Sequence, residues 1–340
     1  MFNFIVRRIV QLPLVLLGVS VLIFGVLQLV PPEVRATSYI TNEKQLNQIP
    51  QLVKQYGLDK DVFTQYGIWL GNVLHGNLGW STSAKQPVWQ ALADRLPATL
   101  ELALFAIIPI VLFGLFFGIL AGTRRNTVLD QFIRVFSIFT YSLPTFVVGI
   151  FLLAYFYGVL QLFEPGRYNT ILTLTQGLST QDLNGFLFFK ALLSGNWTLL
   201  ADLARHLVLP VVTLMVVSSA SLTQIVRSNV IEQLRQDYVR TARSKGLGSR
   251  RIVYRHALRN ALIPIITVVG ALLFGLVSGV VITETVFNYP GVGNFAAQAA
   301  IINDTSGVLG FALFSAFAIS VINLIVDLLY GVIDPRVRYD

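Results

Sequence analysis

The amino-acid sequence predicts an all-α membrane protein with six transmembrane helices. Hydrophobic residues make up 54% of its 340 residues and charged residues only 12%, whereas an average soluble domain has about 25% charged residues. The mean hydropathy of +0.68 agrees with this composition. A globule of this length needs more polar surface than these residues supply, so a soluble enzyme is excluded.

Six stretches are long and apolar enough to cross a bilayer, which takes about 20 mostly apolar residues in a helix. We place these predicted spans at residues 9–30, 98–122, 132–162, 206–226, 261–283 and 308–331. The first span follows Arg7 and Arg8, as a secretory signal would. It is too long for a signal, and Val30 to Glu33 offer no small-residue cleavage site, so we expect a retained anchor.

Lysine and arginine are distributed unevenly among the segments between these spans. If the N-terminus is inside, the cytoplasmic segments together hold 16 Lys/Arg and 5 Asp/Glu. These segments are residues 1–8, 123–134, 227–260 and the residues after 331. The outer segments hold 9 Lys/Arg and 10 Asp/Glu. An excess of Lys/Arg in short loops marks the cytoplasmic side. Both termini are therefore predicted to be cytoplasmic, and the net charge of +8 requires no nucleic-acid partner.

Two predicted outer segments, residues 31–97 and 163–205, are long enough to form structure of their own. The first contains two runs rich in aromatic residues and glycine, at 66–70 and 76–80. Aromatic residues there also suit an interfacial belt, but about 67 residues exceed what a simple connection requires. We expect an ordered extracytoplasmic element at 31–97, between an N-terminal part (1–30) and a core domain (98–340).

The cytoplasmic loop at residues 228–260 contains two short helical patterns separated by glycines. In its first half, apolar residues recur at helical spacing: Ile231, Leu234, Tyr238 and Ala242. Gly246 and Gly248 interrupt this pattern, and Ser249 can cap a second helix. In the second helix, arginines form one stripe and apolar residues lie on other faces: Arg251, Arg255 and Arg259 against Ile252, Val253 and Ala257.

Three interpretations of this loop compete. A basic amphipathic helix pair suits contact with anionic lipid, and its charges also suit a role in orientation alone. Lipid contact does not require a glycine break, whereas a compact knob that fits a cleft in a partner needs a turn and rigid arms. The break therefore favours a partner-binding knob.

Two stretches of this loop carry a family resemblance, Asp237 to Leu247 and His256 to Pro264. They resemble the coupling loop of bacterial ABC importer permeases, and within these the dipeptide/oligopeptide/nickel family. The general importer pattern has Glu-Ala-Ala, three residues and then glycine. This chain has Arg240-Thr241-Ala242 and then Gly246, a variation that is common in the peptide and nickel branch.

The resemblance covers nearly the whole chain in the correct order. Further similar motifs lie at residues 65–70, 76–79, 87–88, 96–100, 142–146, 206–210, 284–293 and 334–338. The chain departs from the family at Val30-Pro31-Pro32-Glu33, where a Pro-Gly-Asp type of sequence is usual. Taken together, the motifs are highly specific for this family.

The resemblance implies the fold of a type I ABC importer permease and a protein that is not itself an enzyme. It implies a second homologous permease subunit, two ATP-binding subunits and an extracytoplasmic substrate-binding protein in a bacterial or archaeal cell (inner) membrane. The chain has no G-x-x-x-x-G-K-[ST] phosphate loop. We therefore expect no cofactor on this chain, and expect ATP and magnesium in the partner ATPases. Di- or oligopeptides are the first expectation for the cargo, before nickel or oligosaccharides.

The resemblance assigns contact with the ATPase to residues of the loop: Asp237, Tyr238, Arg240, Thr241, Ala242, Lys245, Gly246 and Leu247. Gly246 is predicted to need a backbone conformation that other residues adopt only at a cost. An ordinary helix stop is the alternative explanation for a glycine at this position.

Candidates for the pore or gate are less specific: Ser142, Pro144, Thr145, Glu284, Pro290, Gly291 and Gly293. A proline inside a span frees a carbonyl, and hydroxyls beside it either face water or satisfy the broken helix locally. The stretch 284–293 is expected to form an external gate or to contact the binding protein; the alternative is a plain turn. Glu101 and Asp327 lie near span ends, and we expect structural roles for both.

Two other functional classes fit the sequence poorly. A secondary transporter driven by an ion gradient is expected to carry an intramembrane ion site and paired half-folds. A membrane-embedded hydrolase requires paired Ser/His or metal-ligand spacing within the spans. Neither pattern is present, and His75, His206 and His256 are too far apart in sequence to suggest a metal site.

Overall fold

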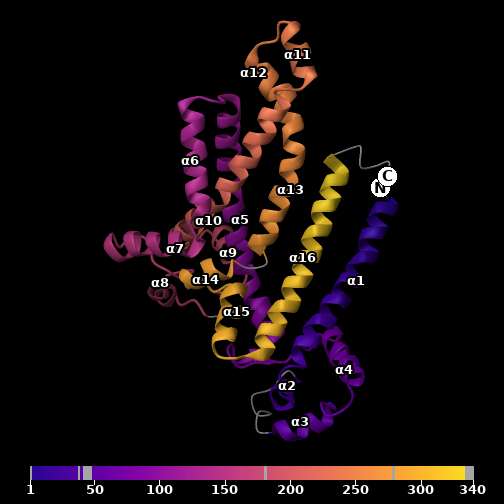
Figure 1. The fold of residues 1–340 in the computed structure, drawn as a ribbon. Helices are drawn as coiled ribbons and strands as arrows, with labels where there is room; N and C mark the ends of the chain where they lie inside the picture. Colours follow the sequence, from indigo (N-terminus) through magenta and orange to yellow (C-terminus); the bar gives the residue numbers. More distant parts are fainter. Residues whose placement is uncertain (1, 37–38, 41–47, 180–181, 278–279, 334–340) are drawn as a thin grey trace. The chain divides into compact units, whose positions relative to one another are not determined.

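The computed structural model describes residues 2–36, 39–40, 48–179, 182–277 and 280–333, and it is predominantly helical (Figure 1). One short antiparallel ladder pairs β1 (Trp80–Ser81) with β2 (Gln86–Pro87). The predicted helical class is therefore confirmed. The C-terminal motif at 334–338 and the side chain of Asp327 lie outside the described part.

Within the described residues, three helices are long and apolar enough to cross a membrane: α5 (Val88–Thr123), α10 (Trp197–Gln233) and the Thr305–Val326 part of α16 (Thr305–Ile333). Shorter apolar helices are described at Pro13–Leu27, in α1 (Phe2–Leu27), and at Val268–Val277, in α13 (Leu258–Val277). All five helices coincide with predicted spans, and the count of six spans stays a prediction.

The predicted third span, residues 132–162, is not one straight helix. Helix α6 (Val128–Ser142) ends before Pro144, and the chain resumes as α7 (Thr145–Leu153) and the π-helix η3 (Ala154–Val159). The two parts are bent by 92° and together pass as a fourth candidate span. Proline forces the preceding residue out of the helical conformation, and Leu143 is extended, with φ −81° and ψ 129°.

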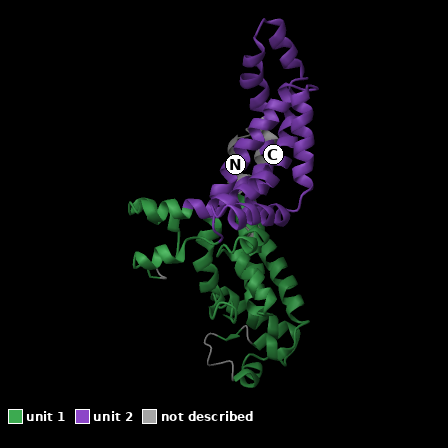
Figure 2. Cartoon of the chain, turned by 90° about the vertical axis from the view of Figure 1, so that its left-hand side faces the viewer, with its two compact units in different colours: residues 1–101, 166–203, 277–324 green, residues 102–165, 204–276, 325–340 purple. Residues whose placement is uncertain are grey.

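The chain divides into two compact units, each of which combines segments distant in sequence (Figure 2). Unit 1 contains residues 1–101, 166–203 and 277–324, and unit 2 contains residues 102–165, 204–276 and 325–340. Unit 1 contains most of the shorter helices, and unit 2 contains the predicted coupling loop at residues 228–260.

In unit 1, the segment predicted to be an ordered element folds as α2 (Pro32–Ala36), α3 (Ile49–Gln55) and α4 (Val62–Leu74). Apolar residues form its core: Ala36, Tyr39, Ile40, Leu52 and Leu58. Asp61 caps α4, and the hydrogen bonds from Thr64 lower the pKa of its carboxyl group. The described residues of this segment thus form helices around a core, while its bounds of 31–97 and its extracytoplasmic position stay predictions.

Four more helices complete unit 1: α8 (Thr170–Thr175), α9 (Leu187–Leu193), α14 (Val281–Val286) and α15 (Val292–Ile301). Helix α9 packs on the start of α10 through a buried cluster: Leu183, Leu187, Ala191, Leu199 and Leu203. Helix α15 packs on the start of α5 through another: Val88, Ala91, Leu92, Val292 and Phe295.

In unit 2, helices α5 and α10 approach each other closely along a row of glycines. Gly114, Gly118 and Gly122 face Leu222, Val226 and Val230, in that order. A Cβ atom at Gly118 would lie 2.5 Å from the Cβ atom of Val226. Because these three positions of α5 carry no side chain, the backbones of α5 and α10 can approach each other closely.

Candidate coupling site

The loop after α10 folds as a helix–turn–helix, residues 237–257, which we call the knob. Helix α10 ends at Gln233, and α11 (Asp237–Ser244) begins after an extended Gln236, with φ −67° and ψ 152°. The predicted continuous apolar face from Ile231 to Ala242 is therefore wrong, because the helix breaks between them. Asp237 lies in the first turn of the new helix, where a negative charge is favourable.

Gly246 ends the first arm of the knob in the left-handed conformation, with φ +74°. The amide of Leu247 donates to the carbonyl of Ala242 over 3.2 Å, and the amide of Gly246 donates to Arg243 over 2.9 Å. This is the glycine C-terminal motif of helices. The predicted need for an unusual backbone conformation at Gly246 is confirmed.

The second arm consists of α12 (Ser249–Arg251) and the π-helix η4 (Ile252–Ala257), which continues directly into α13. Gly248 occupies the N-cap position, and no side chain caps the helix. The predicted cap at Ser249 is therefore wrong, because Ser249 is already the first helical residue. Ile252 and Ala257 are buried, as the apolar pattern indicates.

A small apolar core holds the two arms of the knob together. Val239 and Ala242 from α11 and Ile252 from η4 are 0%, 7% and 2% exposed, and Tyr238 and Leu247 pack against them. The hydroxyl of Tyr238 lies 2.9 Å from Oε1 of Gln233 and donates to it. The knob therefore has an interior of its own.

This core divides the predicted coupling residues into two groups. Ala242 is buried, and Tyr238 and Leu247 are half-buried. The remaining residues are exposed: Asp237, Arg240, Thr241, Lys245 and Gly246. The exposed group can contact a partner directly, whereas the other residues maintain the shape of the knob.

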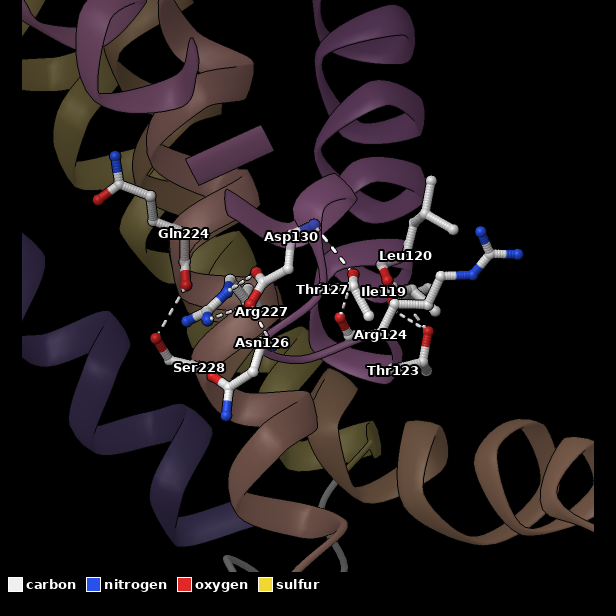
Figure 3. A network of polar contacts seen from close by, with 10 residues as sticks. All are labelled: Ile119, Leu120, Thr123, Arg124, Asn126, Thr127, Asp130, Gln224, Arg227 and Ser228. Atoms are coloured by element: carbon white, nitrogen blue, oxygen red, sulfur yellow. Dashed lines mark hydrogen bonds and ion pairs between the residues drawn. The ribbon is translucent and has the colours of Figure 1, made fainter. Parts of the chain in front are cut away.

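A partly buried ion pair lies near the base of the knob, in the last part of α10 (Figure 3). Nε and Nη2 of Arg227 donate to the two carboxylate oxygens of Asp130 over 2.6 and 2.9 Å. The amide of Asn126 donates to the same carboxylate over 2.9 Å. Thr127 caps α6, which carries Asp130. The 123–127 loop is thus fixed to α10 ten residues before α11 begins.

The stretch 284–293, a candidate gate, forms a tight turn between α14 and α15. Glu284 is fully buried, and its carboxylate accepts hydrogen bonds from Thr99 Oγ1 over 2.6 Å and from the Asn294 amide over 2.9 Å. Burial raises the pKa of Glu284, while these hydrogen bonds act in the opposite direction. Thr99 Oγ1 also accepts from the Val292 amide over 2.9 Å. Glu284 therefore fastens the turn to α5.

The glycines of this turn fit closely around the same carboxylate. Gly291 and Gly293 are buried, whereas Pro290 is exposed. A Cβ atom on Gly291 would collide with the carboxylate of Glu284, and one on Gly293 would lie 2.7 Å from Cα of Val281. Both glycines are therefore required by packing.

The break in the bent span carries the other predicted pore residues. Ser142 is exposed and its hydroxyl donates to the carbonyl of Ile138 over 2.8 Å. Pro144 is the exposed N-cap of α7, and Thr145 is half-buried. For Ser142, the described hydrogen bond is the local one that satisfies the broken helix.

Two polar clusters of unit 1 are not anticipated by the sequence motifs. Glu101 accepts from Arg167 over 2.6 Å and from the Phe188 amide over 2.9 Å, which confirms its structural role. Asp304 accepts from the hydroxyls of Ser81 and Ser83. In the sequence, the only signal for these clusters is the position of Glu101 and Asp304 near span ends. Their partners cannot be identified from it, because Arg167 is 66 positions from Glu101 and Ser81 is more than 200 positions from Asp304.

Among the described residues, no three or more His, Cys, Asp or Glu side chains form a group that could hold a metal ion.

The knob presents exposed charged groups and hydroxyls on a packed core. Its arrangement is suited to contact with a partner.

Two protein-family models match this chain, and together they cover most of it. Residues 1–103 match the N-terminal part of the membrane component of binding-protein-dependent transport systems, and residues 114–339 match the inner membrane component of these systems. The knob and the turn at 284–293 both lie inside the second match.

Several permeases of peptide transport systems are similar along nearly the whole chain. The di/tripeptide transport system permease protein of Pseudomonas aeruginosa is 36% identical over 100% of this chain and 99% of its own length. The probable D,D-dipeptide transport system permease protein of Escherichia coli is 38% identical over 97% and 96%. The oligopeptide transport system permease protein of Bacillus subtilis is 32% identical over the full length of both.

These matches decide the class of protein. In this family the ATPase activity belongs to separate subunits, and the chain itself is not an enzyme. The chain belongs to the family of binding-protein-dependent transport system inner membrane components, the permease subunits of ABC importers.

Proposed function

We propose that this chain is the permease subunit of an importer for di- or oligopeptides and that its knob receives the motion of two ATPase subunits. The cargo is supported by the full-length relatives, whose names refer to di/tripeptides, D,D-dipeptides and oligopeptides. The observation that carries the coupling role is the exposed polar surface of α11 on a knob with its own packed core.

In this proposal the chain crosses the membrane six times with both termini in the cytoplasm. The bent α6–η3 pair coincides with one of the six apolar stretches, and five helices coincide with the others: α1, α5, α10, α13 and α16. The excess of Lys/Arg in 123–134 and 227–260 supports the assignment of these loops, and hence the knob, to the cytoplasmic side. Residues 31–97 then form an extracytoplasmic element between the anchor and the core domain.

The knob is connected so that a push on α11 reaches two helices of the core. One arm follows α10 after a three-residue turn, and the other continues into α13 with helical backbone at Leu258, φ −64° and ψ −39°. ATP-driven closure of the partner ATPases, which hold the ATP and magnesium, would displace the knob. The displacement would shift the helix packing between outward- and inward-open states.

A second, homologous permease subunit would complete the pore, to which Ser142, Pro144 and Thr145 are candidates to contribute. An extracytoplasmic binding protein would dock on residues 31–97 and on the 284–293 turn, whose exposed residues include Asn288 and Pro290. The buried Glu284, Gly291 and Gly293 would fix the shape of that turn.

The test is peptide uptake by proteoliposomes that contain the complete complex. We expect uptake of a labelled dipeptide that requires ATP, both ATPase subunits and the binding protein, and no uptake by the isolated chain. Uptake by the isolated chain in response to an ion gradient would contradict the proposal.

The orientation has a separate test, because the chain contains no cysteine and a single introduced thiol is unambiguous. In Arg243→Cys, on the exposed surface of α11, we expect labelling by an impermeant reagent only after the cytoplasmic side is opened. Labelling from outside intact cells would contradict the orientation.

A further inference from the structure

The second arm of the knob carries an open hollow that the coupling role does not use. The hollow has a volume of about 660 Å³ and is lined by Arg250, Arg251, Tyr254 and Arg255. All four side chains are exposed, Tyr254 to 60%. The side chains of three arginines and one tyrosine thus border one open place on the surface, and the surface that lines it is mostly apolar.

The positive charge of this hollow has no counter-ion within the described chain. The ion pairs of the described residues involve other arginines: Arg167 with Glu101, Arg227 with Asp130, and Arg240 with Asp237. Guanidinium groups bind phosphate oxygens through two parallel hydrogen bonds, and such charge-assisted bonds are strong. The hollow therefore has the chemistry of a site for a phosphate group.

The hollow is distinct from the surface that we assign to the ATPase. No residue of α11 contributes to its lining. Ile252 and Ala257, on other faces of the same arm, are buried, and Ile252 packs against Val239 and Ala242 of α11. The arginines thus occupy the part of the second arm that does not pack on α11.

One end of the hollow, at Tyr254 and Arg255, lies close to the start of a predicted membrane span. The helix continues from η4 into α13, and the span is predicted to begin at Ala261. Arg255 precedes Ala261 by six residues, which is about 9 Å or less along a helix. The headgroup layer occupies about 5–7 Å on each side of the hydrocarbon core, and arginine side chains extend toward it. Tyr254 belongs to the residue types enriched at this depth.

We propose that this hollow binds the phosphate group of an anionic phospholipid, such as phosphatidylglycerol, in the cytoplasmic leaflet. The inference rests on the cytoplasmic orientation of the knob. Bound lipid holds the second arm of the knob at the membrane surface while α11 contacts the ATPase. Juxtamembrane arginines near an anionic leaflet favour this occupant over a free anion.

The test measures lipid retention by the purified permease complex with native mass spectrometry, using phosphatidylglycerol and phosphatidylcholine as probes. The wild type is expected to prefer phosphatidylglycerol. Arg251→Gln and Arg255→Gln are each expected to lower this preference about fivefold, and the triple variant that adds Arg250→Gln is expected to abolish it. The control variant carries Arg124→Gln, Arg125→Gln and Arg134→Gln, which removes equal charge from the other loop, and is expected to retain the preference.

Several results would overturn the proposal. An unchanged preference in both single variants, or an equal loss in the control, shows that the hollow is not the lipid site. Saturation by inorganic phosphate without any lipid preference assigns the hollow to a free anion. Loss of the ATPase subunits from the triple variant, with lipid retained, assigns it to the protein partner. Peptide uptake is measured in parallel, because failure of uptake in the wild type would reject the function and not the lipid site.

Discussion

At the scale of single residues, three buried carboxylates of this chain are held by partners that are distant in sequence: Glu101, Asp130 and Glu284. Glu101 is predicted from the sequence to lie near a span end with a structural role, but Arg167 is not predicted as its partner. Asp130, Arg227 and Thr99 carry no prediction, and Glu284 is predicted only as a candidate gate residue, without its partner Thr99. Apolar spacing is a local signal, whereas these pairs depend on the tertiary fold.

The Asp130–Arg227 pair provides a first prediction. The Asp130 side chain is 2% exposed, so Asp130→Asn leaves a guanidinium group without its counter-ion. We expect a loss of about 2 kcal/mol in the free energy of unfolding, below the range for a fully buried pair because Arg227 is partly exposed. Asp237→Asn breaks an exposed pair and should change the free energy of unfolding by less than about 0.5 kcal/mol.

Denaturant unfolding of the purified chain in detergent micelles measures both variants. Equal effects of Asp130→Asn and Asp237→Asn would show that the pair at the base of the knob contributes no more than a surface contact.

The buried hydroxyl of Thr99 provides a second prediction. Thr99→Val keeps the shape of the side chain but removes a donor to Glu284 and an acceptor for the Val292 amide. Two buried groups lose a partner, so we expect a loss of about 2 kcal/mol or more in the free energy of unfolding. Thr285→Val is the control, because Thr285 is exposed and bonds only to its own helix.

The same unfolding assay applies, and the control should lie within about 0.5 kcal/mol of the wild type. A Thr99→Val variant as stable as the control would contradict the assignment of Glu284 as the residue that fastens the 284–293 turn to α5.

At the scale of elements, sequence patterns locate the helices better than they describe their ends and bends. The bent third span follows from Pro144, a signal that is present in the sequence but does not specify an angle. The break between α10 and α11 falls inside a run of helical apolar spacing, because tertiary packing of Val239, Ala242 and Ile252 overrides it. Gly114, Gly118 and Gly122 form a four-residue repeat that predicts close helix packing but not the partner helix.

This glycine row gives a third prediction. A methyl group at Gly118 meets Val226 of α10 at 2.5 Å, so Gly118→Ala must separate the helices or move that side chain. Overpacking of this kind costs about 1–3 kcal/mol. Gly67→Ala, in α4, is the control because no atom lies within 4 Å of the added methyl group.

Unfolding of the two alanine variants separates packing from helix propensity. Gly118→Ala should be destabilised and Gly67→Ala should not, since alanine favours a helix. Equal stability of both variants would mean that the row of glycines is not needed for contact between α5 and α10.

At the scale of the whole molecule, the family is readable from the sequence because its motifs extend along the entire chain. The coupling residues are predicted as one set, and the structure divides them into an exposed surface and a supporting core. That division depends on which face of α11 packs on η4, and a linear motif does not contain this information.

The most direct test of the coupling role is the number of ATP molecules hydrolysed for each peptide imported by the reconstituted complex. Gly246 has φ +74°, which proline cannot adopt, whereas Gly248 has φ −63°, the angle that proline requires. We predict that Gly246→Pro continues to hydrolyse ATP while uptake falls at least about tenfold, since the turn that joins the two arms is lost. Gly248→Pro should retain coupled uptake. Wild-type uptake per ATP in the Gly246→Pro complex would contradict the coupling role of the knob.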